Sequence, residues 1–232
     1  MESPAFGHQR DQGSSIQLYH VGPAREGRLK PMEDVLKAVP GQFGTILIDP
    51  PWRFTNRTGK VGPEHRRLHR YRTMTFDEIA ALPVGQLALP RSHLYLWCPN
   101  ALLPEGLSIM KGWGFTYKTN IVWYKVRKDG GPDGRGVGFY FRNVTELLLF
   151  GIKGGMRTLA PGRRQVNILV SRKEEHSRKP MQSYDLIEQC SPGPYLELFA
   201  RERKEQWIQW GDELGIYEQN RPVHRAYARL RS

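Results

Sequence analysis

The chain has 232 residues, of which 35 are Lys or Arg and 23 are Asp or Glu, so its formal net charge is +12. This excess favours a polyanionic partner, either nucleic acid or an anionic surface. No stretch approaches the roughly 20 apolar residues of a membrane-spanning helix, which excludes that class of protein. The first 15 residues lack the apolar region of a secretory signal, and the chain has only 2 cysteines. We therefore expect a cytoplasmic protein, with the nucleus as the alternative.

Strands and helices are predicted to alternate along the chain. Residues 1–30 are expected to form a flexible tail with one short strand at 16–20, and residues 216–232 a basic tail. Apolar and β-branched runs predict strands at 43–49, 93–98, 120–125, 146–152, 195–200 and 207–210. Helices are predicted at 31–39, 101–111 and 179–189. This order predicts one α/β domain over residues 31–215 with a mostly parallel sheet.

The expected ligand-binding edge of such a sheet is formed by the carboxyl ends of its strands. Function is therefore sought just after Asp49, Cys98, Ile152 and Ala200. Residues 53–72 carry seven basic side chains against one acidic one, and residues 153–179 carry eight against two. Both segments follow a predicted strand, so we expect them to flank one cleft and to contact phosphates; an ordinary solvated surface is the alternative. The residues assigned to this substrate-binding surface are Arg66, Arg67, Arg70, Arg163 and Arg164.

The most specific motif is Asp49-Pro50-Pro51-Trp52, directly after a predicted buried strand. The prolines lack N–H groups and hold the chain extended, which would fix the direction of the Pro50 carbonyl. Together with the Asp49 carboxylate, that carbonyl could accept both hydrogens of the exocyclic amine of a base and free its lone pair for attack on a methyl group. Trp52 offers a flat face on which an extruded base could stack. The structural alternative is a rigid turn with Trp52 in the core.

Further segments follow this motif in a characteristic order. They are Tyr71–Thr75, an acidic helix at 76–82, Glu146–Gly151, His176–Pro180, Ser191–Gly193, Glu197–Arg201 and Trp210–Glu213. With Asp49–Trp52, they make residues 43–215 resemble the MT-A70-like family of adenine-N6 methyltransferases. The resemblance implies a Rossmann-like methyltransferase fold, with helices on both faces of the sheet. It also implies S-adenosylmethionine as the methyl donor and S-adenosylhomocysteine as the product.

The resemblance also implies roles for individual residues. Asp49, Pro50, Pro51 and Trp52 would be catalytic, and Asp49 would also bind the ammonium side of the donor. Tyr71 would line the acceptor pocket. Lys179 would pair with the carboxylate of the donor, Glu197 and Arg201 would contact its ribose region, Phe199 would lie near its adenine, and Asp212 and Glu213 would bind its ribose hydroxyls. Many relatives carry an amide at the last two positions.

Structural alternatives exist for several of these residues. Glu197 could cap the sheet, Lys179 could begin a helix in solvent, and Phe199 could be core. Glu146 could pair with a local arginine such as Arg142. No metal site is expected, because the histidines lack ligand spacing.

The predicted activity is methylation of the 6-amino group of adenine in DNA. DNA is preferred over RNA because the chain lacks the long zinc-finger extensions often found on messenger-RNA enzymes. RNA methylation is one alternative, and a non-catalytic nucleic-acid-binding subunit is another, although such subunits typically lack the Asp-Pro-Pro-Trp motif. Whether the chain acts alone, as a homodimer or as a heterodimer is left open.

Overall fold

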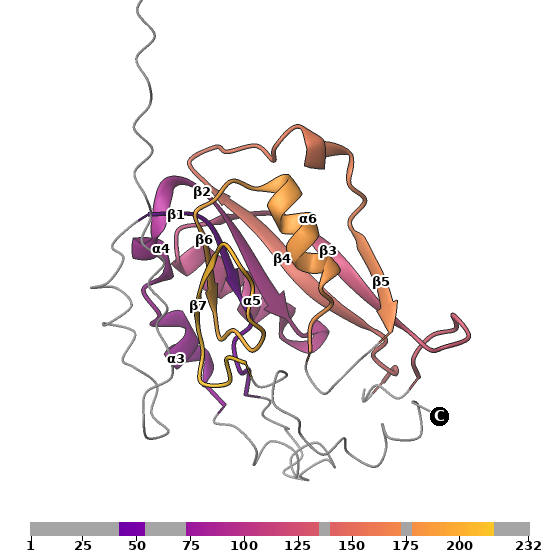
Figure 1. Ribbon diagram of the computed structural model, residues 1–232. Helices are drawn as coiled ribbons and strands as arrows, with labels where there is room; N and C mark the ends of the chain where they lie inside the picture. The colour runs from indigo at the N-terminus through magenta and orange to yellow at the C-terminus, as the bar shows by residue number, and fades with distance from the viewer. Residues whose placement is uncertain (1–41, 54–72, 135–139, 173–177, 216–232) are drawn as a thin grey trace, which may run out of the picture.

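The computed structural model describes residues 42–53, 73–134, 140–172 and 178–215 (Figure 1). The two predicted tails, the strand at 16–20 and the helix at 31–39 lie outside these ranges. The described part forms a seven-stranded sheet in the order β5-β3-β4-β2-β1-β6-β7. The strands are β1 Phe43–Ile48, β2 Ala88–Cys98, β3 Thr116–Val126, β4 Thr145–Lys153, β5 Ile168–Arg172, β6 Tyr195–Leu198 and β7 Trp207–Trp210.

Helices cover both faces of this sheet, as the resemblance implied (Figure 1). The helices are α3 Phe76–Ala80, α4 Val84–Leu87, α5 Leu103–Gly112 and α6 Gln182–Cys190, with short 3₁₀ turns η1 Asn100–Leu102 and η2 Pro161–Arg164. Alternate residues of a strand point to opposite faces. Ile46 and Ile48 of β1 therefore join the core under α3, α4 and α5. Leu47 joins Tyr184 and Ile187 of α6 in the other core.

The sheet is mixed but mostly parallel. β1 pairs in parallel with β2 and β6, β6 with β7, and β3 with β5. β4 is antiparallel to both of its neighbours. Its last residue, Lys153, pairs with Ser92 near the start of β2, whereas its first, Thr145, pairs with Tyr124 near the end of β3. The expectation of a ligand-binding site after Ile152 is therefore wrong, and the start of β4 lies at that edge instead.

Several element boundaries differ from the sequence prediction. The strand β5 was not predicted, because it lies in a basic segment and exposes Ile168 and Val170 on one side. The strand predicted at 195–200 ends at Leu198, since Phe199 adopts a left-handed backbone with a φ of 65°. In the described ranges, no helix reaches the length and apolarity that crossing a bilayer requires.

Candidate active site

The Asp-Pro-Pro-Trp segment forms a fixed turn at the carboxyl end of β1. The Asp49 N–H donates to the Leu198 carbonyl of β6 at 3.3 Å. The Trp52 N–H donates to the Pro50 carbonyl at 2.8 Å, and Met74 N–H donates to the Pro51 carbonyl at 2.8 Å. A carbonyl oxygen has two lone pairs, so Pro50 keeps one for another donor. Asp49 is thereby held at the edge where the parallel strands β1 and β6 end.

Trp52 does not present the free stacking face that the sequence suggested. Its side chain is only 8% exposed and belongs to the core under α3 and α5. Its indole N–H donates to the Trp97 carbonyl at 2.9 Å. A buried tryptophan gains from packing its large apolar body, provided that its N–H finds an acceptor. Trp52 is therefore a core residue, as the structural alternative held. Its packing and its hydrogen bond stabilise the turn that carries Asp49.

Four alternating charges form a row across the strand ends, which we call the charge row: Asp49, Lys179, Glu146 and Lys125. The Lys179 ammonium lies 3.0 Å from Asp49 Oδ1 and 2.9 Å from Glu146 Oε1. The Lys125 ammonium lies 2.8 Å from Glu146 Oε2. Burial opposes ionisation of Glu146, but Lys179 and Lys125 outweigh it and lower the pKa of Glu146 to about 2. Burial likewise lowers the pKa of Lys179, yet Asp49 and Glu146 outweigh it and raise that pKa.

The contacts of the charge row show that the structural alternatives considered for Glu146 and Lys179 are wrong. Glu146 pairs with Lys125 and Lys179 rather than with Arg142. Lys179 is not a solvated residue at the start of a helix, because its side chain is 15% exposed and α6 begins only at Gln182. Reasoning from the sequence missed Lys125 entirely. Its position at the end of a predicted strand was the available signal.

Another carboxylate, that of Glu197, is held differently. Glu197 is buried on β6, where the Tyr184 hydroxyl donates to its Oε1 at 2.9 Å and the Gln209 amide donates to its Oε2 at 2.6 Å. Burial raises the pKa of Glu197 to about 7, although these two hydrogen bonds act in the opposite direction. Tyr184 and Gln209 were not predicted as site residues.

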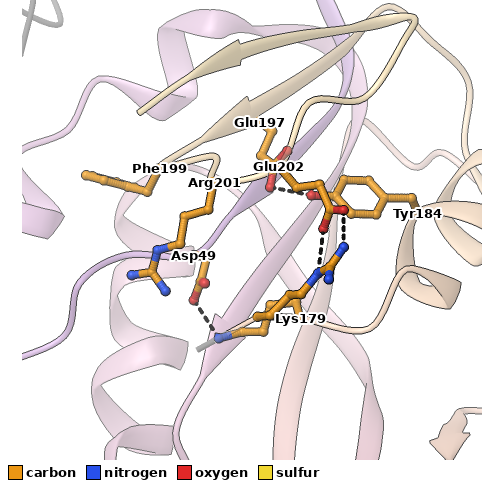
Figure 2. Close-up of a pocket in the computed structure, with 8 residues that line it drawn as sticks. Asp49, Lys179, Tyr184, Glu197, Phe199, Arg201 and Glu202 are labelled. Atoms are coloured by element: carbon orange, nitrogen blue, oxygen red, sulfur yellow. Dashed lines mark hydrogen bonds and ion pairs between the residues drawn. The ribbon is translucent and has the colours of Figure 1, made fainter. Parts of the chain in front are cut away.

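A pocket opens beside Asp49, with a volume of about 280 Å³ that includes space open to solvent. Its lining residues are Asp49, Arg178, Lys179, Tyr184, Glu197, Phe199, Arg201 and Glu202 (Figure 2). The Arg178 Nε donates to Glu202 Oε2 at 3.0 Å, and the two side chains bridge the segment before α6 and the β6–β7 loop. Arg201 Nε lies 3.0 Å from Glu213 Oε2.

Five of the seven residues predicted to bind the donor line this pocket: Asp49, Lys179, Glu197, Phe199 and Arg201. Glu213 does not line the pocket, but it forms an ion pair with Arg201, which does. Asp212 is exposed and does not belong to the lining. Phe199 packs edge to face against Trp210, with ring centroids 5.4 Å apart, so that it lies between core and pocket.

None of the arginines predicted to bind the substrate is found beside the pocket in the described residues. Tyr71, Arg66, Arg67 and Arg70 lie outside the described residues. Arg163 and Arg164 belong to η2, which contacts the last turn of α6, where Leu159 N–H donates to the Cys190 carbonyl at 2.8 Å. Because α6 begins near Asp49 and runs away from it, η2 lies at the opposite edge of the sheet. The expectation that Arg163 and Arg164 emerge at the ligand-binding edge is wrong, and the reversal of β4 is the reason.

The pocket suits a ligand with the chemistry of S-adenosylmethionine. Lys179 could hold the carboxylate of the ligand, Phe199 offers an apolar face for its adenine, and Glu197 presents a buried carboxylate to its positive groups or hydroxyls. The described residues contain no group of three His, Cys, Asp or Glu side chains that could hold a metal ion.

Comparison with known proteins supports this description. The family model MT-A70 matches residues 43–213. The chain is 31% identical over 182 residues to the putative N(6)-adenosine-methyltransferase MT-A70-like of Medicago truncatula, which covers 75% of this chain and 27% of that protein. It is 24% identical over 218 residues to the type II methyltransferase M.MunI of Mycoplasma sp, covering 87% of this chain and 91% of the relative.

A further relative is named as a non-catalytic protein. The chain is 28% identical over 209 residues to the N(6)-adenosine-methyltransferase non-catalytic subunit METTL14 of Drosophila melanogaster, which covers 83% of this chain and 51% of that protein. The chain thus spans about a quarter of the Medicago truncatula protein, half of the Drosophila melanogaster protein and nearly all of M.MunI.

Proposed function

The chain belongs to the MT-A70 family, and from that premise we propose that it transfers a methyl group from S-adenosylmethionine to the 6-amino group of adenine in DNA. The observation that carries the proposal is the pocket beside Asp49, in which a fixed carboxylate at a strand end lies next to Lys179, Glu197 and Phe199. These side chains come from distant parts of the sequence and converge on one small space (Figure 2).

We assign distinct tasks to the residues of the turn. S-adenosylmethionine, when bound, supplies an electrophilic methyl group on a positively charged sulfur. The Asp49 carboxylate and the Pro50 carbonyl accept the two hydrogens of the adenine amine, which directs the nitrogen lone pair toward that methyl group. Among the described residues, Lys179 pairs with Asp49 Oδ1 at 3.0 Å, which leaves Oδ2 for the amine. As the bond between the methyl group and sulfur breaks and S-adenosylhomocysteine is left, the negative charge of Asp49 stabilises the positive charge that develops on the amine, which then loses one proton to solvent.

DNA is proposed as the substrate on the likeness to the type II methyltransferase M.MunI, which extends over 218 residues at 24% identity. RNA is the second candidate, since adenosine in the names of other relatives denotes a ribonucleoside. A non-catalytic role is opposed by the intact Asp49–Trp52 turn and its contact with Lys179.

The experiment is methyl transfer from labelled S-adenosylmethionine to oligonucleotides of one sequence, supplied as single-stranded DNA, duplex DNA and RNA. We expect 6-methyladenine in DNA. The matched control is Asp49→Asn, which keeps the size of the side chain but removes its charge. Loss of one such electrostatic partner costs about a hundredfold or more in rate. We expect that loss in a protein that still folds and binds nucleic acid as before, with a melting temperature lowered by loss of the buried Asp49–Lys179 ion pair.

The possible outcomes separate the candidates. Transfer to RNA alone would replace the proposed substrate, and donor binding without any transfer would favour the non-catalytic subunit. A near wild-type rate for folded Asp49→Asn would reject the assigned role of this carboxylate.

A further inference from the structure

The side chain of Gln209 on β7 connects three parts of the pocket wall. Gln209 pairs in register with Glu197 of β6. Its Nε2 donates to Glu197 Oε2 at 2.6 Å and to the Glu202 carbonyl at 2.7 Å, while its Oε1 accepts from the Lys204 N–H at 2.8 Å. Turning the amide over would place its oxygen against a carboxylate and a carbonyl, so the three partners define its orientation. Gln209 thereby fixes Glu197 relative to the β6–β7 loop.

Glu197 differs from the other carboxylates around the pocket in the groups that hold it. Asp49 pairs with Lys179, Glu202 with Arg178, and Glu213 with Arg201. Both oxygens of Glu197 instead accept from neutral donors, Tyr184 and Gln209. The cations that line the pocket are thus each matched by another carboxylate. An ionised Glu197 adds one negative charge that these ion pairs do not balance.

The groups facing Glu197 make its ionisation depend on those two donors. Burial has the largest effect and raises its pKa, and the negative charges of Asp49 at the end of β1 and Glu202 in the loop raise it further. The hydrogen bonds from Gln209 and Tyr184 lower it, and the balance lies at about 7. Removing either donor should therefore protonate Glu197 at neutral pH.

We propose that Gln209 is a positioning residue that, with Tyr184, allows Glu197 to ionise near neutral pH, and that the resulting charge shifts the binding preference of the site toward the cationic donor and away from the product. The inference rests on the proposed function. S-adenosylmethionine carries one net positive charge, and S-adenosylhomocysteine, which lacks the sulfonium, carries none. A charge in a partly buried pocket acts more strongly than one in water, so Glu197 distinguishes the two ligands.

The test is calorimetric titration of wild type, Gln209→Leu and Tyr184→Phe with each ligand between pH 6.5 and 9. At pH 7, Gln209→Leu should weaken S-adenosylmethionine about tenfold, which corresponds to one lost charge-assisted contact, and S-adenosylhomocysteine much less. The difference should shrink toward pH 9, where Glu197 ionises without the donor. Tyr184→Phe leaves the Gln209 contacts to the loop in place and should show the same pattern. The control Gln86→Leu alters an exposed glutamine on α4 and should change neither affinity.

A second measurement follows the ionisation of Glu197 directly and needs no ligand. In carbon NMR of the ligand-free chain, the titration midpoint of the Glu197 carboxyl should move upward in Gln209→Leu and stay in place in Gln86→Leu. Equal weakening of both ligands at every pH, or an unmoved midpoint, would reduce Gln209 to a structural residue and overturn the inference. A wild-type chain that binds neither ligand would overturn the proposed function and this inference with it.

Discussion

Glu146 influences Asp49 without lining the pocket, because Lys179 lies between the two carboxylates. The ammonium is 2.9 Å from Glu146 and 3.0 Å from Asp49, so neither carboxylate holds it alone. Without the charge of Glu146, Lys179 would be drawn wholly to Asp49 and would compete with the target amine. In the proposed mechanism, the Glu146 side chain therefore sets how much of the Asp49 charge is available to the target amine.

Substitution of Glu146 by Gln should lower the single-turnover rate of methyl transfer by about tenfold to a hundredfold. The reason is that Lys179, having lost a charge-assisted hydrogen bond worth about 1.5–3 kcal/mol, moves to Asp49 and leaves less of its charge to the amine. Lys125→Met, which acts on Lys179 only through Glu146, should cost less. Nucleic-acid affinity should be unchanged in both variants. A folded Glu146→Gln protein with the wild-type rate would show that Lys179 needs no second partner.

At the scale of single residues, five donor-pocket residues were predicted, because the motifs of the chain resemble those of the MT-A70-like family and carry the roles over by position. The partners of Glu146 could not be predicted, since strand direction is invisible in a run of apolar residues. The burial of Trp52 could not be predicted either. A tryptophan after a strand suits a core and a stacking surface equally, and only tertiary packing decides between them.

Among the secondary-structure elements, β2 and the end of α6 are joined by a buried polar cluster at the edge remote from the pocket. His93 Nδ1 and the Tyr95 hydroxyl each lie 2.8 Å from the Ser191 hydroxyl oxygen. Burial lowers the pKa of His93, and its hydrogen bond to the backbone of Met156 only partly opposes this. His93 is therefore neutral in the folded protein at pH 7, and protonation would place a charge in the core.

Stability should accordingly fall in acid. The unfolded chain binds a proton to His93 near pH 6.5, whereas the folded chain binds it only at lower pH, so the contribution of His93 is complete above about pH 6.5 and is lost as the pH falls below it. Glu197 acts in the opposite sense, because its raised pKa favours the folded state at low pH. Urea unfolding of wild type and His93→Leu at pH 7.5 and 5.5 isolates the histidine. A wild-type loss no larger than that of His93→Leu would contradict the prediction.

The direction of β4 is the element-scale feature that the sequence did not predict. Strands alternating with helices indicate parallel pairing, but β3 and β4 are joined by a loop without a described helix, and such a connection suits an antiparallel pair. That one reversal moves Glu146 to the catalytic edge and Arg163 and Arg164 to the opposite one. The type of fold was thus predictable, while the placement of these charges was not.

For the whole molecule, the positive charge should govern nucleic-acid binding. If about six phosphates are neutralised, log affinity should fall with log salt with a slope of about −4 to −5. Changing Arg66, Arg67 and Arg70 together to Ala should flatten the slope by about 2 to 3, which filter binding at several salt concentrations would measure.

The matched control uses the other basic residues. Changing Arg163 and Arg164 to Ala should leave the slope nearly unchanged, since η2 lies away from the pocket. A larger effect from this pair than from the first three arginines would place the nucleic-acid path across the opposite edge of the sheet.

The central position of β1 has a consequence for the order in which the protein is assembled. β1 lies between β2 and β6 (Figure 1). The Thr45 hydroxyl of β1 donates to the Pro192 carbonyl, 147 residues further along the chain. Pairings between such distant segments form late, because a long loop must close before they gain any contact energy. On the ribosome, β1 is made early but must wait for β6. The nascent chain therefore has no complete donor pocket until residues 195–210 have emerged from the exit tunnel.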